Sequence, residues 1–462
     1  MKFHFSGICG AGMGNVACLL QEAGHDVKGS DQNVFPPMSD QLEQLGVRLL
    51  NGYDESRVTA LFQPDFQVVA NALSGTHVEV EAGRKAGLTQ LSFPEVLERF
   101  ILPGRKSYVV AGTHGKTTTS SLLAHLLRPI GAGCFVGGVM KNGDAGCHLG
   151  SEGAPFVLEG DEYDTAFFDK HSKFLHYRPN VLIITHLEWD HVDIFPTFEH
   201  MLKEFRSLIA LLPPDGLIVY CGDHPAIREL IIGFKGKTIS YGVDSHNDVV
   251  LVASRAETSG QILSVKTPWG NFEIKTRLIG KIYHLNLLGA CCAAHCGEKL
   301  PWENFSQLLG NFAGALRRLE ILVESPQVII SDFAHHPTAV AETLNLVREN
   351  WPHRRLVAIF DPRNATSRRN VFEERLGVSL SLADVVFIAP PPVDHRLTDA
   401  DRLNPRQLCS KIAGAREYFE EGSAFCRSVL EALKPDDIVV VMSCGSCYGL
   451  LGMLKANSSL EP

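Results

Sequence analysis

The sequence lacks several features that mark large classes of proteins. No apolar run approaches the length of a membrane span, and no internal repeat or low-complexity tract is present. Basic residues are not in excess, because 43 Lys and Arg stand against 52 Asp and Glu, for a formal net charge of −9. Nucleic-acid binding needs concentrated positive charge, so this balance argues against a nucleic-acid partner. It leaves room for local basic pockets that bind phosphorylated small molecules.

The start of the chain shows no secretory signal pattern. Residues 1–7 interrupt their apolar run at His4 and Gly7, which predicts a first β-strand instead. The twelve cysteines are scattered among predicted helices and strands. Without a signal peptide such cysteines are expected to be reduced thiols, so the sequence predicts a cytoplasmic protein with no membrane span.

Two groups of cysteines have spacings that could carry redox or metal chemistry. Cys444 and Cys447 have the C-x-x-C spacing, and three cysteines and a histidine gather in Cys291–Cys296. The C-x-x-C spacing is common by chance. The second group lies on an apolar helical stretch that suits small buried residues. Structural roles are therefore favoured for both groups.

Strands alternate with helices along most of the chain, which predicts an α/β fold with parallel sheets. A chain of 462 residues is too long for one hydrophobic core, and three α/β domains with boundaries near residues 102 and 322 fit this length. Residues 249–274 have a turn-rich, alternating character that predicts antiparallel strands flanking the central sheet. The main expected strands are Lys2–Ile8, Asp26–Ser30, Phe66–Ala70, Ser107–Val110, Phe156–Leu158, Val181–Thr185, Val328–Ile330, Leu356–Phe360, Val385–Ile388 and Ile438–Met442, and helices are expected near Met13–Ala23 and Ser39–Leu45.

A phosphate-binding loop is predicted at Gly112–Thr118, between an apolar strand and a helix that carries four leucines. Glycines allow backbone N–H groups to turn toward an anion, and the N-terminus of the following helix adds partial positive charge. Lys116 can reach the outer phosphates of ATP, and the hydroxyl of Thr117 can bind Mg²⁺. The longer form of this motif would have a glycine where Val110 stands, so this is a compact version.

A second glycine-rich turn, Gly7–Gly14, follows the first strand, and Gly29–Asp31 ends the next one. An acidic residue about 20 positions after such a turn is also what a dinucleotide-binding protein shows. The turn departs from the G-x-G-x-x-G pattern, however. Beside a phosphate loop a hundred residues later, a dinucleotide oxidoreductase is the weaker alternative.

Two acidic clusters follow predicted parallel strands of the central domain, at 159–164 and at 187–191. The carboxyl ends of parallel strands meet at one edge of a sheet, so both clusters are expected beside the phosphate loop. Phosphoryl transfer needs divalent cations, and hard oxygen ligands suit Mg²⁺. Solvated acidic loops are the simpler alternative, but the order of loop and clusters favours a magnesium site.

The compact loop Thr113–Thr118 closely resembles that of the Mur ligases, especially the branch that acts on UDP-N-acetylmuramate. The Gly7–Gly14 turn followed by Gly29–Asp31 resembles the UDP-sugar-binding start of that branch. The resemblance implies a Rossmann-like UDP-sugar-binding domain at 1–102, a P-loop ATPase domain at 103–322 and a Rossmann-like C-terminal domain at 323–462.

The motifs of the third domain at 316–320, 332–338 and 361–363 also resemble the family pattern. The resemblance implies roles for single residues. The residues expected to bind ATP are Gly112, Thr113, His114, Gly115, Lys116, Thr117, Thr118, Asn286, Asp332 and His335. Those expected to bind the UDP-sugar are Gly10, Ala11, Gly12, Met13, Ser30 and Asp31. Those expected to bind Mg²⁺ are Thr117, Glu159 and His191, with Glu162, Asp190 and Glu188 as second choices. The expected catalytic residues are Lys116, His191, Arg317, Arg318 and Arg363.

Residues 164–174 and 190–195 resemble the branch of the family that acts in peptidoglycan recycling. This resemblance implies an ATP-dependent ligase that joins the murein tripeptide L-Ala-γ-D-Glu-meso-diaminopimelate to UDP-N-acetylmuramate through an acyl phosphate. We expect the tripeptide near Asp169, Lys170, His171, Lys173 and Arg363. The alternatives are the alanine-adding ligase of peptidoglycan biosynthesis and, less favoured, a nucleotide-binding regulator without ligase activity.

Four segments depart from the family pattern. On the adenine side, Ile282 and Tyr283 replace the usual His-Asn, which leaves the adenine contacts open. Ser331 replaces an Asp, His186 stands where Asn is usual, and residues 443–446 replace a Ser-Asn-Gly-Gly turn. None of these changes removes a residue expected to bind phosphate or metal, so a working enzyme with altered nucleotide contacts remains the prediction.

Overall fold

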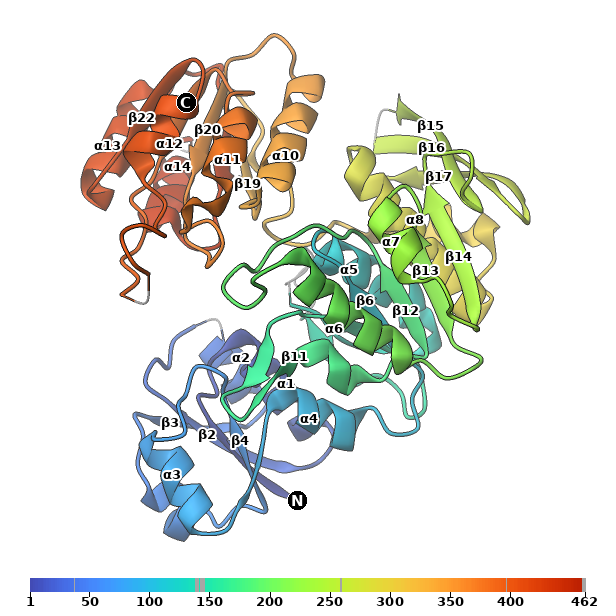
Figure 1. Cartoon of the computed structure of the whole chain (residues 1–462), viewed down its shortest axis with the longest axis vertical. Helices are drawn as coiled ribbons and strands as arrows, with labels where there is room; N and C mark the ends of the chain where they lie inside the picture. Colours follow the sequence, from blue (N-terminus) through green and yellow to red (C-terminus); the bar gives the residue numbers. More distant parts are fainter. Residues whose placement is uncertain (37, 138–140, 142–145, 258–259, 396, 459–462) are drawn as a thin grey trace. The chain divides into compact units, whose positions relative to one another are not determined.

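The structure is a computed structural model that describes residues 1–36, 38–137, 141, 146–257, 260–395 and 397–458. Its internal contacts divide the chain into two units. The first unit contains Met1–Glu188 and Phe198–Gly314, and the second contains Trp189–Thr197 and Ala315–Pro462. The family-typical α/β architecture with parallel-rich sheets is confirmed within these units (Figure 1).

The N-terminal part of the first unit is a five-stranded parallel sheet in the order β3-β2-β1-β4-β5. Consecutive residues of its central strand, Phe3 to Ser6, are all buried, as expected for a parallel strand covered on both faces. The strands are β1 (Lys2–Ser6), β2 (Asp26–Asp31), β3 (Arg48–Asn51), β4 (Phe66–Val69) and β5 (Thr89–Leu91). The helices are α1 (Ala11–Glu22), α2 (Met38–Gln44), α3 (Val78–Lys85) and α4 (Phe93–Val96).

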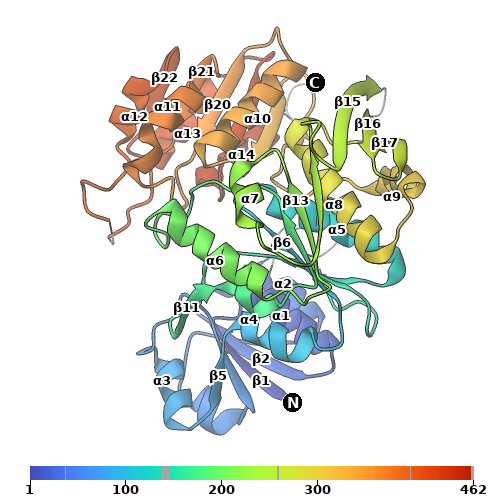
Figure 2. The ribbon, with the colours of Figure 1, turned by 45° about the vertical axis from the view of Figure 1, so that its right-hand side comes forward.

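The central part of the first unit is a ten-stranded sheet in the order β17-β16-β15-β14-β13-β12-β6-β9-β7-β8. The predicted antiparallel flank is present as β15–β17, at one edge of the sheet (Figure 2). The strands are β6 (Ser107–Ala111), β7 (Gly133–Phe135), β8 (Cys147–His148), β9 (Phe156–Glu159), β12 (Val181–Ile184), β13 (Leu217–Cys221), β14 (Lys237–Gly242), β15 (Val249–Glu257), β16 (Gly260–Thr267) and β17 (Gly270–Thr276). The helices are α5 (Lys116–Leu127), α6 (Phe198–Ala210), α7 (Pro225–Leu230), α8 (Lys281–Glu298) and α9 (Phe305–Leu308).

Helix α8 lies against both α5 and the sheet, and its residues 286–294 are all buried. A Cβ added at Gly289 would lie 2.9 Å from the ring of Tyr241, so this glycine allows the helix to approach β14 closely. Because every face of this part of α8 is buried, its sequence is mostly apolar, which explains the apolar stretch around Cys291 and Cys292. None of the twelve cysteines, all of them within the described residues, forms a disulfide.

The second unit is a six-stranded sheet in the order β18-β19-β23-β20-β21-β22, parallel except for β18. Alternate strand residues face two cores: Ile330 packs with α10–α12 on one face, and Ile329 with α13 and α14 on the other. The strands are β18 (Glu320–Val323), β19 (Val328–Asp332), β20 (Leu356–Phe360), β21 (Val385–Ile388), β22 (Ala415–Tyr418) and β23 (Ile438–Met442). The helices are α10 (Pro337–Asn350), α11 (Glu373–Leu380), α12 (Pro405–Lys411), α13 (Gly422–Ala432) and α14 (Leu450–Ser458).

Two segments of the range expected to form the central domain, 103–322, group with the C-terminal sheet or the second unit. Strand β18 pairs with β19, so the C-terminal sheet already includes Glu320. The short segment Trp189–Thr197 groups by its contacts with the second unit, although it follows β12 of the first. Strand pairing decides the first placement and long-range contacts decide the second, and a local sequence pattern reveals neither. Among the residues that the structure describes, no helix is long and apolar enough to cross a membrane.

Candidate functional site

The phosphate loop joins β6 to α5 and needs glycine at two positions. Gly112 and Gly115 have φ values of 133° and 83°. A Cβ added at Gly112 would lie 2.5 Å from Oγ1 of Thr185, and one at Gly115 would lie 2.3 Å from Oδ1 of Asn286. The loop is therefore pressed against the residues that follow β12 on one side and against α8 on the other. Asn286, expected on the adenine side, lies directly against the loop.

Lys116, the first residue of α5, lies at the centre of the loop. Its Nζ donates to the carbonyl of Gly112 at 2.7 Å and lies 2.7 Å from Oε2 of Glu162. Burial alone would lower the pKa of Lys116, but the carboxylates of Glu162, Asp161 and Glu159 together raise it. The ammonium group thus stays charged although it is largely buried.

Glu162 was a second choice as a metal ligand, and the structure gives it another partner. Its carboxylate binds Lys116, and burial is the main cause that raises the pKa of Glu162 to about 7. Burial also opposes ionisation of Asp161, but Lys173, whose Nζ lies 2.6 Å from Oδ2, holds the pKa of Asp161 below its usual value. Two lysine–carboxylate pairs, Lys116–Glu162 and Lys173–Asp161, thus lie beside the loop.

Thr117 and Glu159 lie together, as expected for a shared cation. Thr117 Oγ1 donates to Oε1 of Glu159 at 2.6 Å, and Oε2 accepts from the backbone N–H of Gly137 at 2.7 Å. This hydroxyl–carboxylate pair consists of the hard oxygen ligands that Mg²⁺ prefers. The residues present therefore fit a magnesium ion next to the loop.

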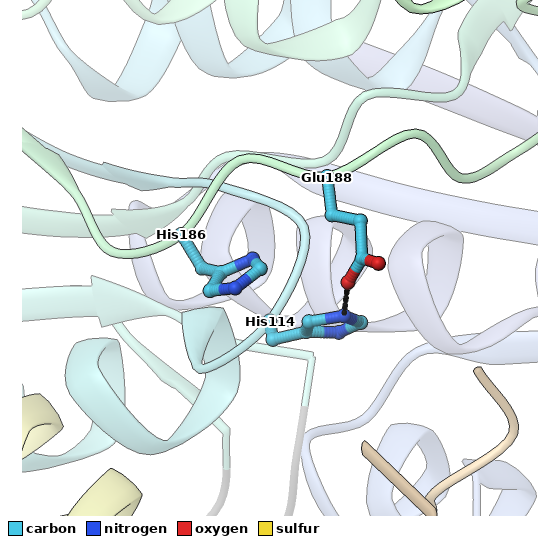
Figure 3. A group of neighbouring side chains, drawn as sticks. All are labelled: His114, His186 and Glu188. Atoms are coloured by element: carbon cyan, nitrogen blue, oxygen red, sulfur yellow. Dashed lines mark ion pairs between the residues drawn. The ribbon is translucent and has the colours of Figure 1, made fainter. Parts of the chain in front are cut away.

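The segment that follows β12 is bound to the phosphate loop by its backbone. Thr113 N donates to the carbonyl of His186 at 2.8 Å, and Thr113 Oγ1 donates to the carbonyl of Glu188 at 2.8 Å. His114, His186 and Glu188 consequently converge (Figure 3). Sequence reasoning treated these three residues separately, and the only local signal was the departure of His186 from the family's Asn.

The glycine-rich turn of the N-terminal sheet places Gly10–Met13 at the beginning of α1, with Gly10 as the N-cap residue. Asp31, at the end of β2, accepts from the backbone N–H of Cys9 at 2.9 Å, so it lies beside the same turn. These residues come together as a helix N-terminus that can receive an anion. Their contacts with a UDP-sugar stay a prediction.

The side chain of Ser30, expected to bind the UDP-sugar, has a different environment. It is fully buried and donates to Oε2 of Glu79 at 2.5 Å, and Ser6 and His4 bind the same oxygen. Burial opposes ionisation of Glu79, but these hydrogen bonds hold its pKa below the usual value. The Ser30 hydroxyl therefore has a structural role beneath the turn. Sequence reasoning missed Glu79 because it lies 49 residues from Ser30.

The segment expected to receive the tripeptide folds as a hairpin of β10 (Asp164–Ala166) and β11 (Asp169–Ser172). Lys170 and His171 are paired with Asp164 and Asp169, at 2.6 and 3.1 Å, and their side chains are 66% and 73% exposed, so a ligand can contact them from solvent. Asp169 is bound by His171 and His176, and Lys173 is largely buried and donates to Asp161. The hairpin is anchored to the N-terminal part, because Asn71 donates to the carbonyl of Asp164 at 3.0 Å.

In the second unit, His191 follows an aspartate that is tightly held. Asp190 Oδ1 accepts from Thr366 Oγ1 at 2.7 Å and from His191 N at 2.6 Å, and its Oδ2 lies 3.7 Å from Nε2 of His335. Burial opposes its ionisation, yet His191 and His335 hold the pKa of Asp190 well below its usual range. Burial would lower the pKa of His335, but Asp190 and Cys444 raise it to about 10.

Asp332 and Arg317, expected to contact ATP and phosphate, also have defined partners in the second unit. Asp332 is buried and accepts from the backbone N–H groups of Leu319 and Ala334 at 2.7 and 2.8 Å. Arg317 has a φ of 56° and donates to the carbonyl of Cys444 at 3.2 Å.

The two remaining arginines each lie over an aromatic ring. Arg318 lies over the ring of Phe333 at 4.6 Å, and Arg363 lies over that of Tyr448 at 5.0 Å. Arg363 also donates to Oδ2 of Asp361 at 3.0 Å. The expected residues thus lie in both units, and those of the first unit are divided among the turn before α1, the phosphate loop and the β10–β11 hairpin. The convergence of His191 with Thr117 and Glu159 stays a prediction.

Models of three Mur ligase domains match this chain in succession. The Mur ligase family catalytic domain matches residues 2–104, the Mur ligase middle domain 110–294, and the Mur ligase glutamate ligase domain 317–445. The chain belongs to the Mur ligase family. Membership in this family makes it an ATP-dependent ligase that forms amide bonds, and it confirms the three-domain α/β architecture.

Individual relatives cover nearly the whole chain. The UDP-N-acetylmuramate–L-alanyl-γ-D-glutamyl-meso-2,6-diaminoheptandioate ligase of Escherichia coli is 34% identical over 97% of this chain and 96% of its own. The UDP-N-acetylmuramate–L-alanine ligase of Kineococcus radiotolerans is 32% identical over 96% and 93%. The crystal structure of a murein peptide ligase from Psychrobacter arcticus superimposes with a TM-score of 0.74 at 29% identity, covering 100% and 99% of the two chains.

Proposed function

We propose that this ligase joins the tripeptide L-Ala-γ-D-Glu-meso-diaminopimelate to the lactyl carboxylate of UDP-N-acetylmuramate, as a step of peptidoglycan recycling in the cytoplasm. The observation that carries this proposal is the 34% identity, over 97% of the chain, to the E. coli enzyme named for that reaction. The exposed polar side chains of Lys170 and His171 on the β10–β11 hairpin support it, because the second and third residues of the tripeptide add carboxylates that need a polar surface.

The phosphate loop and Lys116 supply the electrostatics of the first step. Lys116 keeps its charge inside the loop, where it offsets charge that develops on the γ-phosphate as this group passes from ATP to the carboxylate. The resulting acyl phosphate is attacked by the α-amine of the tripeptide, and phosphate leaves. Arg317 or Arg318 is assigned to the same developing charge, since a guanidinium forms a fixed planar fork.

Thr117 and Glu159 are the residues that would hold Mg²⁺ in the first unit, and His191 is the residue assigned to it in the second. A bound magnesium ion offsets phosphate charge. Lys116 and Lys173 are paired with Glu162 and Asp161, which leaves the carboxylate of Glu159 to the cation.

The UDP part of the sugar nucleotide is assigned to the N-terminus of α1. Gly10–Met13 offer backbone N–H groups to its diphosphate, and Asp31 lies beside them to receive hydroxyl hydrogen bonds. The Ser30 hydroxyl is left out of this assignment because it is bound to Glu79.

A second candidate is the alanine-adding reaction, because the K. radiotolerans relative of that name is 32% identical over 96% of the chain. The two reactions share ATP and UDP-N-acetylmuramate and differ only in the amine. Alanine has no side-chain charge for Lys170 and His171 to bind. The two candidate reactions therefore differ in the effect that they predict for substitutions in the hairpin.

Specificity constants for tripeptide and L-alanine, measured at saturating ATP and UDP-N-acetylmuramate, test the proposal. We expect the tripeptide to be favoured at least about tenfold, equivalent to roughly 1.4 kcal/mol. Lys170→Ala should raise KM for the tripeptide, whereas Lys85→Ala, which removes an exposed lysine of α3, should not. Equal constants, or a preference for alanine, would assign the chain to the biosynthetic step. If neither the tripeptide nor alanine stimulates phosphate release, the chain would be assigned to the nucleotide-binding regulators without ligase activity.

A further inference from the structure

Three potential metal ligands lie beside the phosphate loop but take no part in the mechanism above as ligands. One ligand atom each of His114, His186 and Glu188 lies within 4.8 Å of the other two. Nε2 of His114 is 3.4 Å from Oε2 of Glu188, and the two imidazole centroids are 4.9 Å apart (Figure 3). All three residues are half-buried, so they are partly shielded from water but remain accessible to an ion.

The main chain fixes the positions of these three residues. The carbonyls of His186 and His114 accept from Thr113 N at 2.8 Å and from Thr185 Oγ1 at 2.5 Å, respectively. Glu188 N donates to Thr113 Oγ1 at 2.9 Å, and its carbonyl accepts from the same hydroxyl. Because these bonds do not involve the ligand atoms, the cluster is held together without a cation, as a preorganised site requires.

The chemistry of the cluster differs from that of the Thr117–Glu159 pair. Two imidazoles and one carboxylate suit Zn²⁺ and its neighbours in the first transition row, whereas Mg²⁺ prefers oxygen ligands only. A further imidazole lies close by, since the ring of His224 is 4.0 Å from that of His186.

We propose that His114, His186 and Glu188 bind a divalent transition-metal cation such as Zn²⁺, at a site distinct from the Thr117–Glu159 pair. Since His114 belongs to the phosphate loop and the other two follow β12, a cation bound by all three ties the loop to residues 185–188. The loop would then move less when the cation is bound.

Calorimetric titration of the nucleotide-free protein with Zn²⁺, in excess Mg²⁺, tests the site directly. We expect one tight Zn²⁺ per chain and at least about tenfold weaker binding in both His186→Asn and Glu188→Gln. His186→Asn introduces the residue usual in the family, so it is the variant best suited to fold. His246→Asn is the matched control, because His246 lies in the separate group with Asp223 and Asp244.

Two further measurements distinguish this site from other places where Zn²⁺ could bind. With Co²⁺ as the probe, we expect visible bands without the thiolate charge-transfer band that cysteine ligands would give. Hydrogen exchange at residues 112–118 should slow on Zn²⁺ addition in the parent but not in His186→Asn, and Glu159→Gln should retain Zn²⁺ binding. Unchanged affinity in His186→Asn, a thiolate band, or weaker binding in His246→Asn or Glu159→Gln would each overturn the proposal.

Discussion

Two glycine-rich turns of the first unit, one after β1 and one after β6, share a backbone plan and differ in the side chains around them. Each leads from a buried parallel strand into a helix whose N-terminus is open to an anion. The turn before α1 has Asp31 beside it, and the loop before α5 holds Lys116 within a ring of carboxylates. The comparison shows that the backbone provides a general anion site, whereas the surrounding charges select the ligand.

The glycines that directly precede the two helices, Gly10 and Gly115, differ in how closely the structure surrounds them. A Cβ at Gly10 would make only ordinary contacts, the nearest at 3.9 Å, and its φ of −64° suits any residue. Gly115 has a positive φ and lies against Asn286. Gly115 is thus the more constrained of these two positions, as expected where a phosphoryl group must be held in line for transfer.

Removing Lys116 should produce the largest difference between the functions of the two turns. We expect Lys116→Ala to lower kcat/KM by at least about a thousandfold, roughly 4 kcal/mol, because the charge that offsets the γ-phosphate is lost. UDP-N-acetylmuramate affinity, measured by calorimetry, should stay within about twofold, since that ligand is assigned to the N-terminal sheet. Loss of UDP-sugar affinity with ATP affinity unchanged would reverse the two assignments.

Adding one methyl group to each turn compares their constraints. Gly115→Ala should weaken ATP binding and cost about 1–2 kcal/mol from its positive φ alone, with a further cost from the contact with Asn286. Gly10→Ala should fold normally, because its φ and its surroundings accept a Cβ. Thermal unfolding and ATP titration of both variants measure this difference. Equal tolerance at the two positions would contradict it.

The buried network beneath the first turn should control stability rather than chemistry. Glu79→Gln should lower the free energy of unfolding by about 2 kcal/mol at neutral pH, because charge-assisted hydrogen bonds to His4, Ser6 and Ser30 are weakened. The folded-state pKa of Glu79 is lowered, so this stabilisation is complete above the usual value of 4.5 and is lost as pH falls through the lowered pKa.

Denaturant unfolding of the parent and of Glu79→Gln at several pH values measures this effect. The difference between the two proteins should shrink as the pH falls below about 4.5. Glu152→Gln, which alters an exposed acid, is the control and should show no such trend. A difference that grows on acidification would contradict the assigned direction of the shift.

The smallest expected effect concerns Thr117 and Glu159, the two residues beside the phosphate loop that are expected to bind Mg²⁺. Glu159→Gln should raise the Mg²⁺ concentration needed for half-maximal activity by about tenfold, because one oxygen ligand loses its charge. His191→Ala should act in the same direction if its imidazole shares this role. Wild-type Mg²⁺ titration curves for both variants would refute the metal assignment.

Sequence patterns predicted strands best where apolar runs are short and bounded by polar residues. Leu356–Phe360 and Val385–Ile388 agree with the observed bounds of β20 and β21. The β10–β11 hairpin was not predicted, because residues 164–172 carry little apolar alternation and depend on contacts such as that of Asp164 with Asn71. The hydrogen bond between the buried Ser30 hydroxyl and Glu79 was also not predicted, because Glu79 comes from α3, which is distant in the sequence.

The sequence by itself determined the family, the phosphate loop and the order of the motifs, because these depend on residue types at fixed local spacing. The tertiary structure decided which side chains meet. It assigned Lys116 to Glu162, Ser30 to Glu79 and the segment Trp189–Thr197 to the second unit. It also brought His114 to His186 and Glu188. Such contacts depend on strand order and on hydrogen bonds between distant segments, so the local spacing of residues does not predict them.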